Sequence, residues 1–306
     1  MSTFGKTIRI YLKDGSVNGI KWGEITNYTI QSISCPRINI TDLVEFSEIK
    51  KPGVYFLFGQ DEQTNDLKAY IGESENTYER MQAHITNKDF WNEVVFFVSK
   101  DENLTKSHAR YLESRLIQMA LSAKRYTIDN YNQSQPASLP PSDRDAMEEF
   151  LTLINLLLGV LGHRILEPIT PLLKAATSDT PSASDIIEGN KEKNILPLAL
   201  SMSGLKANAL QTDEGIVVLE GSEAALTIGS LQPGYQDRRE KLIANGTLQL
   251  IGKKYTFTRI ALFPSPSAAA AVVLGYNANG RKAWKDKNGR TFQEIEAQQL
   301  TTRKIN

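Results

Sequence analysis

Hydrophobic and polar positions alternate along the first third of the chain in a pattern typical of strands and short helices. Apolar runs bounded by Gly, Asn and Asp predict short strands within residues 6–35 and strands at 54–58, 69–72 and 93–99. Apolar positions spaced three and four apart predict helices over 42–49, 75–86 and 104–123. Together these elements predict a compact α+β module with three strands and two helices at its centre.

A longer apolar pattern follows a loop rich in Pro, Ser and Asn at residues 130–142. It predicts a helix within 144–162 with a broad apolar face made of Met147, Phe150, Leu151, Ile154, Leu157, Leu158 and Leu161. This face has two interpretations, as a connector that packs on the first module or as a surface for oligomerisation. Packing is the favoured one.

The chain changes character after about residue 195. The pattern predicts a strand that runs into a turn, a helix over 237–246 and a hairpin that turns at Gly252. A further apolar helix is predicted, with Ser265 as its cap, Pro266 in its first turn and Gly275 at its end. The dipeptides Asn279-Gly280 and Asn288-Gly289 predict a second small hairpin.

These patterns divide the chain into five parts and predict the α+β fold class, with a helical connector and a small mixed α/β C-terminal domain. The parts are a short β-rich N-terminal extension (1–45), the central module (46–135), the connector (136–176), a linker (177–194) and the C-terminal domain (195–306).

Composition narrows the class of protein. The 306 residues are 41% hydrophobic and 23% charged, as in ordinary globular proteins, and a single cysteine, Cys35, permits no internal disulfide. The N-terminus has no signal-peptide core, and the longest apolar run, 151–162, is too short to span a bilayer. We therefore expect a cytoplasmic protein with no membrane partner.

Charge is distributed unevenly along the chain. Residues 234–306 carry 13 Lys and Arg against 5 Asp and Glu, whereas residues 1–233 carry 22 against 30. A basic C-terminal part on an acidic body suggests a polyanionic partner, although small domains often deviate by this much.

Several common catalytic sites are excluded by their missing motifs. The chain has no CxxC, no HExxH and no P-loop, so neither a His/Cys zinc site nor a small-molecule cofactor is expected. One constellation of chemically useful side chains stays: Tyr55, Tyr70, Arg80, His84 and Glu113. Tyrosines on neighbouring strands can lie side by side, and residues four apart share a helix face.

Glu113 is the candidate for a metal ligand. It lies at the edge of an apolar helical stripe, with no Lys or Arg three or four residues later to neutralise it. A divalent ion on this carboxylate, Arg80 on a phosphate oxygen, and a tyrosine with His84 as proton acceptor would suit phosphodiester hydrolysis. The alternative is ordinary: packed tyrosines, a solvated Arg and His, and a surface Glu.

The segments Gly53-Val54-Tyr55 and Tyr70-Ile71-Gly72 resemble the two halves of the signature of the GIY-YIG nuclease family, with Val in place of Ile in the first half. Arg80, eight residues after Gly72, and His84 also match the family pattern, as does Glu113 on a following helix. The resemblance covers roughly residues 50–132.

The resemblance implies a three-stranded antiparallel sheet flanked by helices and a DNA endonuclease that depends on Mg²⁺ or Mn²⁺. It implies that Tyr55 is the general base, Tyr70 orients water or phosphate, and Arg80 contacts the phosphate. His84 would assist proton transfer and Glu113 would bind the metal. The family also has an Asn after this Glu, for which Asn130 is preferred over Asn132 although its spacing is long.

The C-terminal part resembles a domain of unknown function often found behind GIY-YIG modules in bacteria. A basic group around one tryptophan could meet phosphates and stack a base: Arg281, Lys282, Trp284, Lys285, Lys287 and Arg290. Alternatively, Trp284 anchors a core among solvated lysines.

The leading functional interpretation is a metal-dependent DNA endonuclease, with restriction, repair and phage defence as candidate pathways. A nucleic-acid-binding protein that keeps the fold without cleaving is the alternative. The residues do not distinguish DNA from RNA.

Overall fold

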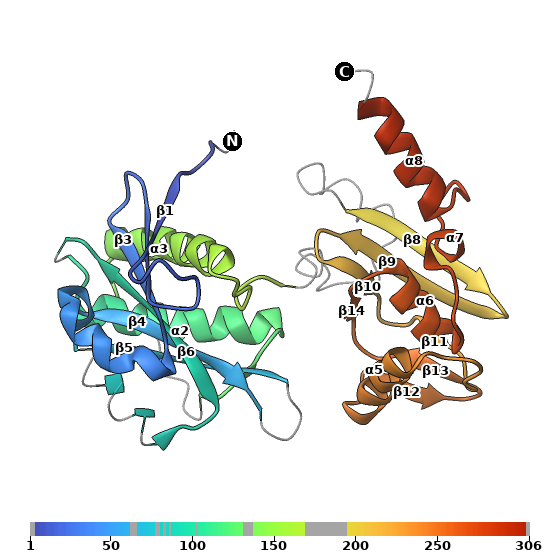
Figure 1. Cartoon of the computed structure of the whole chain (residues 1–306), viewed down its shortest axis with the longest axis horizontal. Coiled ribbons are helices and arrows are strands. Elements are labelled where there is room, and N and C mark those ends of the chain that lie inside the picture. Colours follow the sequence, from blue (N-terminus) through green and yellow to red (C-terminus); the bar gives the residue numbers. More distant parts are fainter. Residues whose placement is uncertain are drawn as a thin grey trace. The chain divides into compact units, whose positions relative to one another are not determined.

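The computed structural model describes residues 4–61, 66–76, 80, 81, 84, 85, 87–101, 103–130, 137–168 and 195–303. The chain forms two units, Met1–Ile169 and Thr170–Asn306, and each is described by itself (Figure 1). The linker predicted at 177–194 and Asn132 lie outside the described residues.

The N-terminal unit is built on one seven-stranded sheet. Its strands are β1 (Ile8–Leu12), β2 (Lys21–Ile25), β3 (Ile30–Pro36), β4 (Gly53–Gln60), β5 (Leu67–Ser74), β6 (Trp91–Ser99) and β7 (Thr127–Ile128). The spatial order is β1-β2-β3-β6-β4-β5-β7. Strand β4 is antiparallel to both β5 and β6, which confirms the expected three-stranded antiparallel sheet. The N-terminal strands extend that sheet because β3 pairs with β6.

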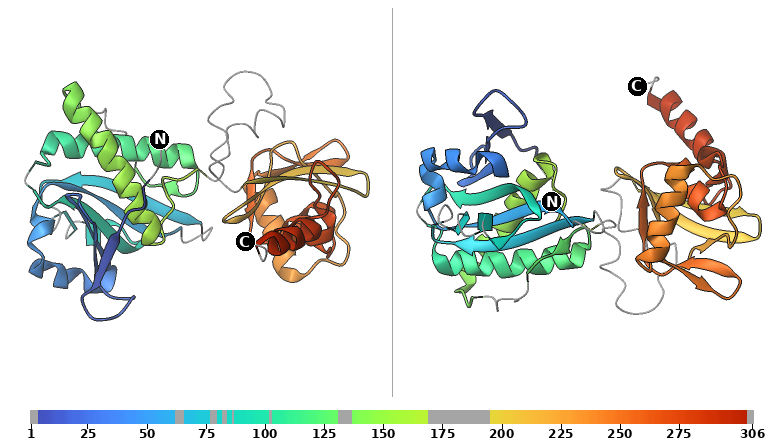
Figure 2. Two further views of the ribbon diagram at one scale, coloured as in Figure 1. Left: turned by 90° about the horizontal axis from the view of Figure 1, so that it is seen from above. Right: turned by 60° about the horizontal axis from the view of Figure 1, so that its bottom comes forward.

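Helices cover both faces of this sheet. They are α2 (Lys106–Ala123), α3 (Pro141–Val160) and two 3-10 helices, η1 (Arg37–Glu45) and η2 (Ser47–Lys50). The short helix expected over 42–49 is therefore two 3-10 segments, since Phe46 between them has an extended backbone. Figure 2 shows α2 along one face of the sheet and the 3-10 helices toward the other.

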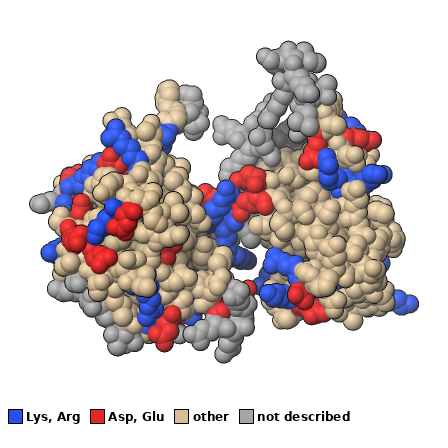
Figure 3. All heavy atoms as spheres, in the orientation of Figure 1, with Lys and Arg blue, Asp and Glu red and all other residues tan. Residues whose placement is uncertain are grey.

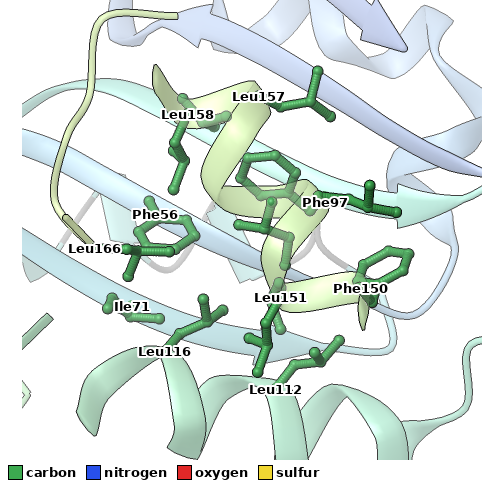
Figure 4. Close-up of a cluster of buried hydrophobic side chains, with 14 of the residues drawn as sticks. Phe56, Ile71, Phe97, Leu112, Leu116, Phe150, Leu151, Leu157, Leu158 and Leu166 are labelled. Atoms are coloured by element: carbon green, nitrogen blue, oxygen red, sulfur yellow. The ribbon is translucent and has the colours of Figure 1, made fainter. Parts of the chain in front are cut away.

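Alternation along the strands sorts their side chains between two cores. Phe56, Ile71 and Phe97 point toward α2 and α3 and pack with Leu112 and Leu151 (Figure 4). The next residues along the strands point to the opposite face, where Tyr55, Leu57 and Phe96 pack against η1, η2 and Met81. The sheet thus presents the tyrosine of β4 on the face away from α2 and α3.

The apolar face of α3 packs into the core of its own unit. Residues from Met147 to Leu158 on this face are buried there, and Leu161 is partly buried. Within the described residues, no helix combines the length and the apolar character needed to cross a membrane.

The C-terminal unit contains two smaller sheets and several helices. One sheet has the order β14 (Ala261–Phe263), β10 (Gly215–Val218), β9 (Leu205–Thr212), β8 (Leu196–Met202), and the other β11 (Glu223–Ala224), β13 (Lys254–Phe257), β12 (Leu248–Ile251). The helices are α5 (Pro233–Ala244), α6 (Pro266–Leu274), α7 (Gly280–Ala283) and α8 (Phe292–Arg303).

Helix α6 is the centre of this unit, and its ends are where the sequence predicts them. The Ser265 hydroxyl accepts a hydrogen bond from the Ala268 amide at 3.1 Å, and Gly275 ends the helix with a left-handed backbone (φ 75°). All its residues from Ala268 to Leu274 are buried, as expected of a helix that is apolar on every side.

The hairpin predicted around residues 279–290 is wrong at its first turn. Asn279-Gly280 opens the short helix α7 instead of a hairpin turn, and Gly280 is needed because a side chain there would overlap the Pro266 carbonyl. The second turn is present, since Gly289 has φ 78° and Lys285 bridges Thr291. The local turn signal at 279 was overridden by the close approach of α6.

Trp284 anchors the C-terminal unit. Its side chain is fully buried, and its indole N–H donates to the Pro266 carbonyl at 3.0 Å. We expect Trp284→Ala to destabilise this unit by about 3–5 kcal/mol in denaturant unfolding followed by circular dichroism. The control, Leu250→Ala, removes a side chain on a residue that is 56% exposed and should cost far less. Unchanged stability together with a specific loss of single-strand binding would restore Trp284 as a stacking residue.

Candidate active site

Two tyrosines meet on the face of the sheet opposite α2. In the register of β4 and β5, Tyr55 lies opposite Gly72 and Tyr70 lies opposite Leu57. The two tyrosine rings are 6.1 Å apart between centroids. Neighbouring strands thus bring the two halves of the sequence signature together on one surface.

Gly72 makes room for the Tyr55 ring. A Cβ atom placed on Gly72 would lie 2.4 Å from both Cζ and the hydroxyl oxygen of Tyr55. The absence of a side chain at this position is therefore a steric requirement of the tyrosine beside it.

The helical residues that follow β5 bring Arg80 and His84 to this face. The Tyr55 hydroxyl lies 2.7 Å from Nε2 of His84, and Nε of Arg80 donates to the same hydroxyl at 3.4 Å. Since the guanidinium is only a donor, the phenol proton can point at Nε2 when the imidazole carries its own proton on Nδ1. Arg80, Tyr55 and His84 therefore form one continuous hydrogen-bonded chain.

Burial sets the protonation states in this chain. It raises the pKa of Tyr55 well above its ordinary value of 10; Tyr70 adds to this, and Arg80 opposes it. Burial also lowers the pKa of His84 from 6.5 to about 4, with further contributions from Arg80 and Lys88. At neutral pH a neutral phenol thus faces a neutral imidazole, which can accept a proton.

The four side chains of this cluster differ in their exposure to solvent. Tyr55 and His84 are buried, Tyr70 is half-buried, and Arg80 is exposed. A ligand that approaches would therefore meet Arg80 and Tyr70 first, with the Tyr55–His84 pair behind them.

Lys88 is a member of the site that sequence reasoning missed. Its ammonium lies 4.4 Å from the centre of the Tyr70 ring and 2.5 Å from the Asp129 carboxylate, which also pairs with Lys68 at 2.9 Å. Lys88 follows His84 by four residues, as His84 follows Arg80. This four-residue spacing is the sequence signal that could have indicated Lys88. The pairing with Asp129, by contrast, depends on the tertiary fold.

Asn130 supports β5 from its outer edge. Its side-chain amide donates to the Ile71 carbonyl at 2.7 Å and accepts from the Ile71 amide at 3.1 Å. The side chain thereby continues the parallel pairing of β7 with β5 by one more residue. Asn130 holds the backbone between Tyr70 and Gly72, so its place in the site is positional.

Glu113 lies on α2, which packs on the other face of the sheet. The side chain is half-buried. Three residues earlier on the same side of α2, Arg110 pairs with Glu73 at 3.6 Å, and this contact brings that side of the helix to β5 just after Gly72. Within the part of the chain that the structure describes, no group of three or more His, Cys, Asp or Glu could hold a metal.

The basic group of the C-terminal unit differs from the expected stacking surface. Trp284 is fully buried, so it offers no face to a base. Arg281 pairs with Glu296 and Arg290 with Asp286, both at 2.7 Å. The remaining members of the group are exposed: Lys282, Lys285 and Lys287. On the side of the molecule seen in Figure 3, basic side chains of this unit lie in separate groups beside acidic ones.

Cys35 is excluded as a nucleophile. It is fully buried on β3, and burial raises its thiol pKa to about 12.

Comparison with known proteins finds a family match in the C-terminal region alone. Residues 198–296 match the model of a family described as a domain of unknown function (DUF4357). The C-terminal unit contains a DUF4357 domain. The match agrees with the expected domain of unknown function in this part and leaves residues 1–197 uncovered. No curated protein and no solved structure matches the chain.

Proposed function

We propose that this chain is a metal-dependent endonuclease of the GIY-YIG type that hydrolyses phosphodiester bonds in DNA. The observation that carries the proposal is the hydrogen-bonded chain of Arg80, Tyr55 and His84, with Tyr70 beside it on the next strand. These are the side chains that the sequence signature singles out, and they converge from two strands and a helix. A packing role alone would not require Arg80 to point at a buried phenol.

The exposed guanidinium of Arg80 would bind a non-bridging phosphate oxygen and stabilise charge that develops there. Lys88, fixed over Tyr70, adds a second positive charge on the same surface. Tyr70 would orient the phosphate or the attacking water.

The Tyr55–His84 pair would take up the proton of that water. The phenol passes its own proton to Nε2 of His84 as it accepts one from the water side, so the phenolate need not accumulate. Because the pKa of His84 is lowered to about 4, its imidazole is free to accept this proton at neutral pH.

A divalent ion fits the available donors if it is held mainly by water. Mg²⁺ binds proteins through one or two carboxylates and keeps several of its waters, so Glu113 alone would be an adequate protein ligand. When bound, the ion would supply positive charge to the leaving oxygen.

One experiment tests the proposal directly. The purified protein is incubated with single-stranded, duplex and branched DNA, and with RNA of matched sequence, in Mg²⁺, Mn²⁺ or excess chelator. We expect metal-dependent cleavage of at least one DNA substrate. Binding without cleavage of any substrate in either metal would favour a non-cleaving nucleic-acid binder instead.

The exposed lysines of the DUF4357 domain are candidates for phosphate contacts. Each phosphate contact releases counterions from the DNA and therefore contributes a slope of about −0.9 to the plot of log affinity against log salt on duplex DNA. Changing Lys282, Lys285 and Lys287 to Ala should therefore flatten that slope by up to about three. The matched control changes three other exposed lysines of this unit, Lys206, Lys241 and Lys253. Equal slopes in both variants would remove this group from the DNA-binding surface.

A further inference from the structure

Arg37 forms hydrogen bonds with the end of the segment that carries Arg80 and His84. It is the first residue of η1, directly after β3, and lies outside the signature-bearing part of the chain. Its Nη1 donates to the Lys88 carbonyl at 2.7 Å and its Nη2 to the Ile85 carbonyl at 2.9 Å. Nη1 also lies 3.3 Å from the Trp91 carbonyl, and the guanidinium stacks 4.5 Å from the Trp91 ring.

The physical reason for this contact is that backbone carbonyls at the end of a helix lack hydrogen-bond donors. The last carbonyls of a helix have no amide partner within the helix, and they carry partial negative charge. One planar guanidinium satisfies several of them at once and adds a favourable positive charge. A lysine could not do the same, because its ammonium is a single point with no planar fork.

Lys88, whose carbonyl Arg37 binds, is directly connected to the candidate catalytic groups. The amide of Lys88 donates to the His84 carbonyl at 3.0 Å, while the Lys88 side chain lies over Tyr70. Arg37 thus fixes, through backbone, the residue that joins His84 to Tyr70. Among the described residues, Arg37 makes no hydrogen bond or ion pair with Tyr55, Tyr70, Arg80 or His84.

We propose that Arg37 is a positioning residue that holds Arg80 and His84 in register with Tyr55 and Tyr70. This inference rests on the proposed nuclease function for its kinetic consequence, but its structural part can be tested without any activity. On this proposal the N-terminal strands do more than widen the sheet, because Arg37 directly follows β3 and is positioned by it.

The test compares Arg37→Lys and Arg37→Gln with a matched control, Arg125→Lys. Arg125 also donates to backbone carbonyls, those of Glu167 and Pro168, and both of these acceptors lie outside the segment with His84. Arg37→Lys keeps the charge and the aliphatic stem, so it remains informative if Arg37→Gln does not fold.

The first readout is the titration of His84 by NMR of histidine-labelled protein. The chain has three histidines, so His84→Gln assigns the signal, and His108 and His163 serve as internal references. In the part of the chain that the structure describes, the charged and titratable groups that face His84 are Tyr55, Tyr70, Arg80 and Lys88. We expect both Arg37 variants to shift the pKa of His84 from about 4 toward 6.5 as the ring gains solvent, and Arg125→Lys to leave it unchanged.

The second readout is steady-state kinetics on a cleaved substrate. Since Arg37 would act through the backbone that carries His84, kcat should fall at least about tenfold while KM changes less than about twofold. An unchanged His84 titration and an unchanged kcat in both variants would overturn the inference. If the wild-type protein cleaves nothing, the nuclease proposal fails, but the His84 titration still decides the role of Arg37.

Discussion

Replacing Glu113 by glutamine is expected to abolish DNA cleavage while the fold remains intact. The amide has nearly the shape of the carboxylate, so packing on the half-buried side of α2 should persist. The lost feature is the negative charge that a hard divalent cation requires of its ligand. Calorimetric titration with Mg²⁺ or Mn²⁺ should show binding to the wild-type protein and none to this variant.

A matched control separates this effect from a general change of charge. Glu73 is also a half-buried glutamate near this side of α2, where it pairs with Arg110. Glu73→Gln should keep metal binding and most of the cleavage. Unchanged metal binding in Glu113→Gln would refute the assignment of Glu113 as the ligand.

Adding one methyl group at Gly72 should reduce cleavage by about a hundredfold or more. The Cβ of Gly72→Ala would lie 2.4 Å from the Tyr55 hydroxyl, which is too close for any real contact, so the ring must move. Movement of that ring breaks its 2.7 Å contact with His84 and its bond from Arg80. A displacement of about 1 Å in a catalytic group can cost a factor of this size.

The effect of Gly72→Ala should be local to the site. The control is Gly159→Ala on α3, where the nearest atom to an added Cβ is a flexible carboxylate oxygen of Glu167 at 3.9 Å. That variant should cleave at the wild-type rate. A folded Gly72→Ala protein with the same rate would show that the position of the Tyr55 hydroxyl does not matter for cleavage.

Local sequence patterns predicted most elements of both units. The apolar runs at 54–58, 69–72 and 93–99 lie within β4, β5 and β6, and the caps of α6 are where Ser265 and Gly275 indicated. These features depend on neighbours in sequence, so a pattern can reveal them.

The predictions that were wrong, a hairpin turn at Asn279-Gly280 and an exposed Trp284, share a different physical cause. Asn279-Gly280 has the chemistry of a hairpin turn, yet α7 forms there because Gly280 packs against the backbone of Pro266. Trp284 sits among lysines in sequence but is buried in space. In both cases a contact with α6, distant along the chain, decided the outcome, and no local pattern contains that information.

The same distinction holds at the candidate site. Tyr55, Tyr70, Arg80 and His84 stand at spacings that a signature can record, and the structure brings these four together. Arg37 and Asp129 act through partners dozens of residues away, so spacing alone could not single them out.

The most direct test of the account is the single-turnover cleavage rate of Tyr55→Phe compared with wild type. Phenylalanine keeps the ring that packs against Phe96 and Tyr70, and removes only the hydroxyl that joins Arg80 to His84. We predict a fall of at least about a hundredfold in rate with unchanged DNA affinity. A Tyr55→Phe protein that cleaves at the wild-type rate would contradict the account and leave Tyr55 as a packing residue.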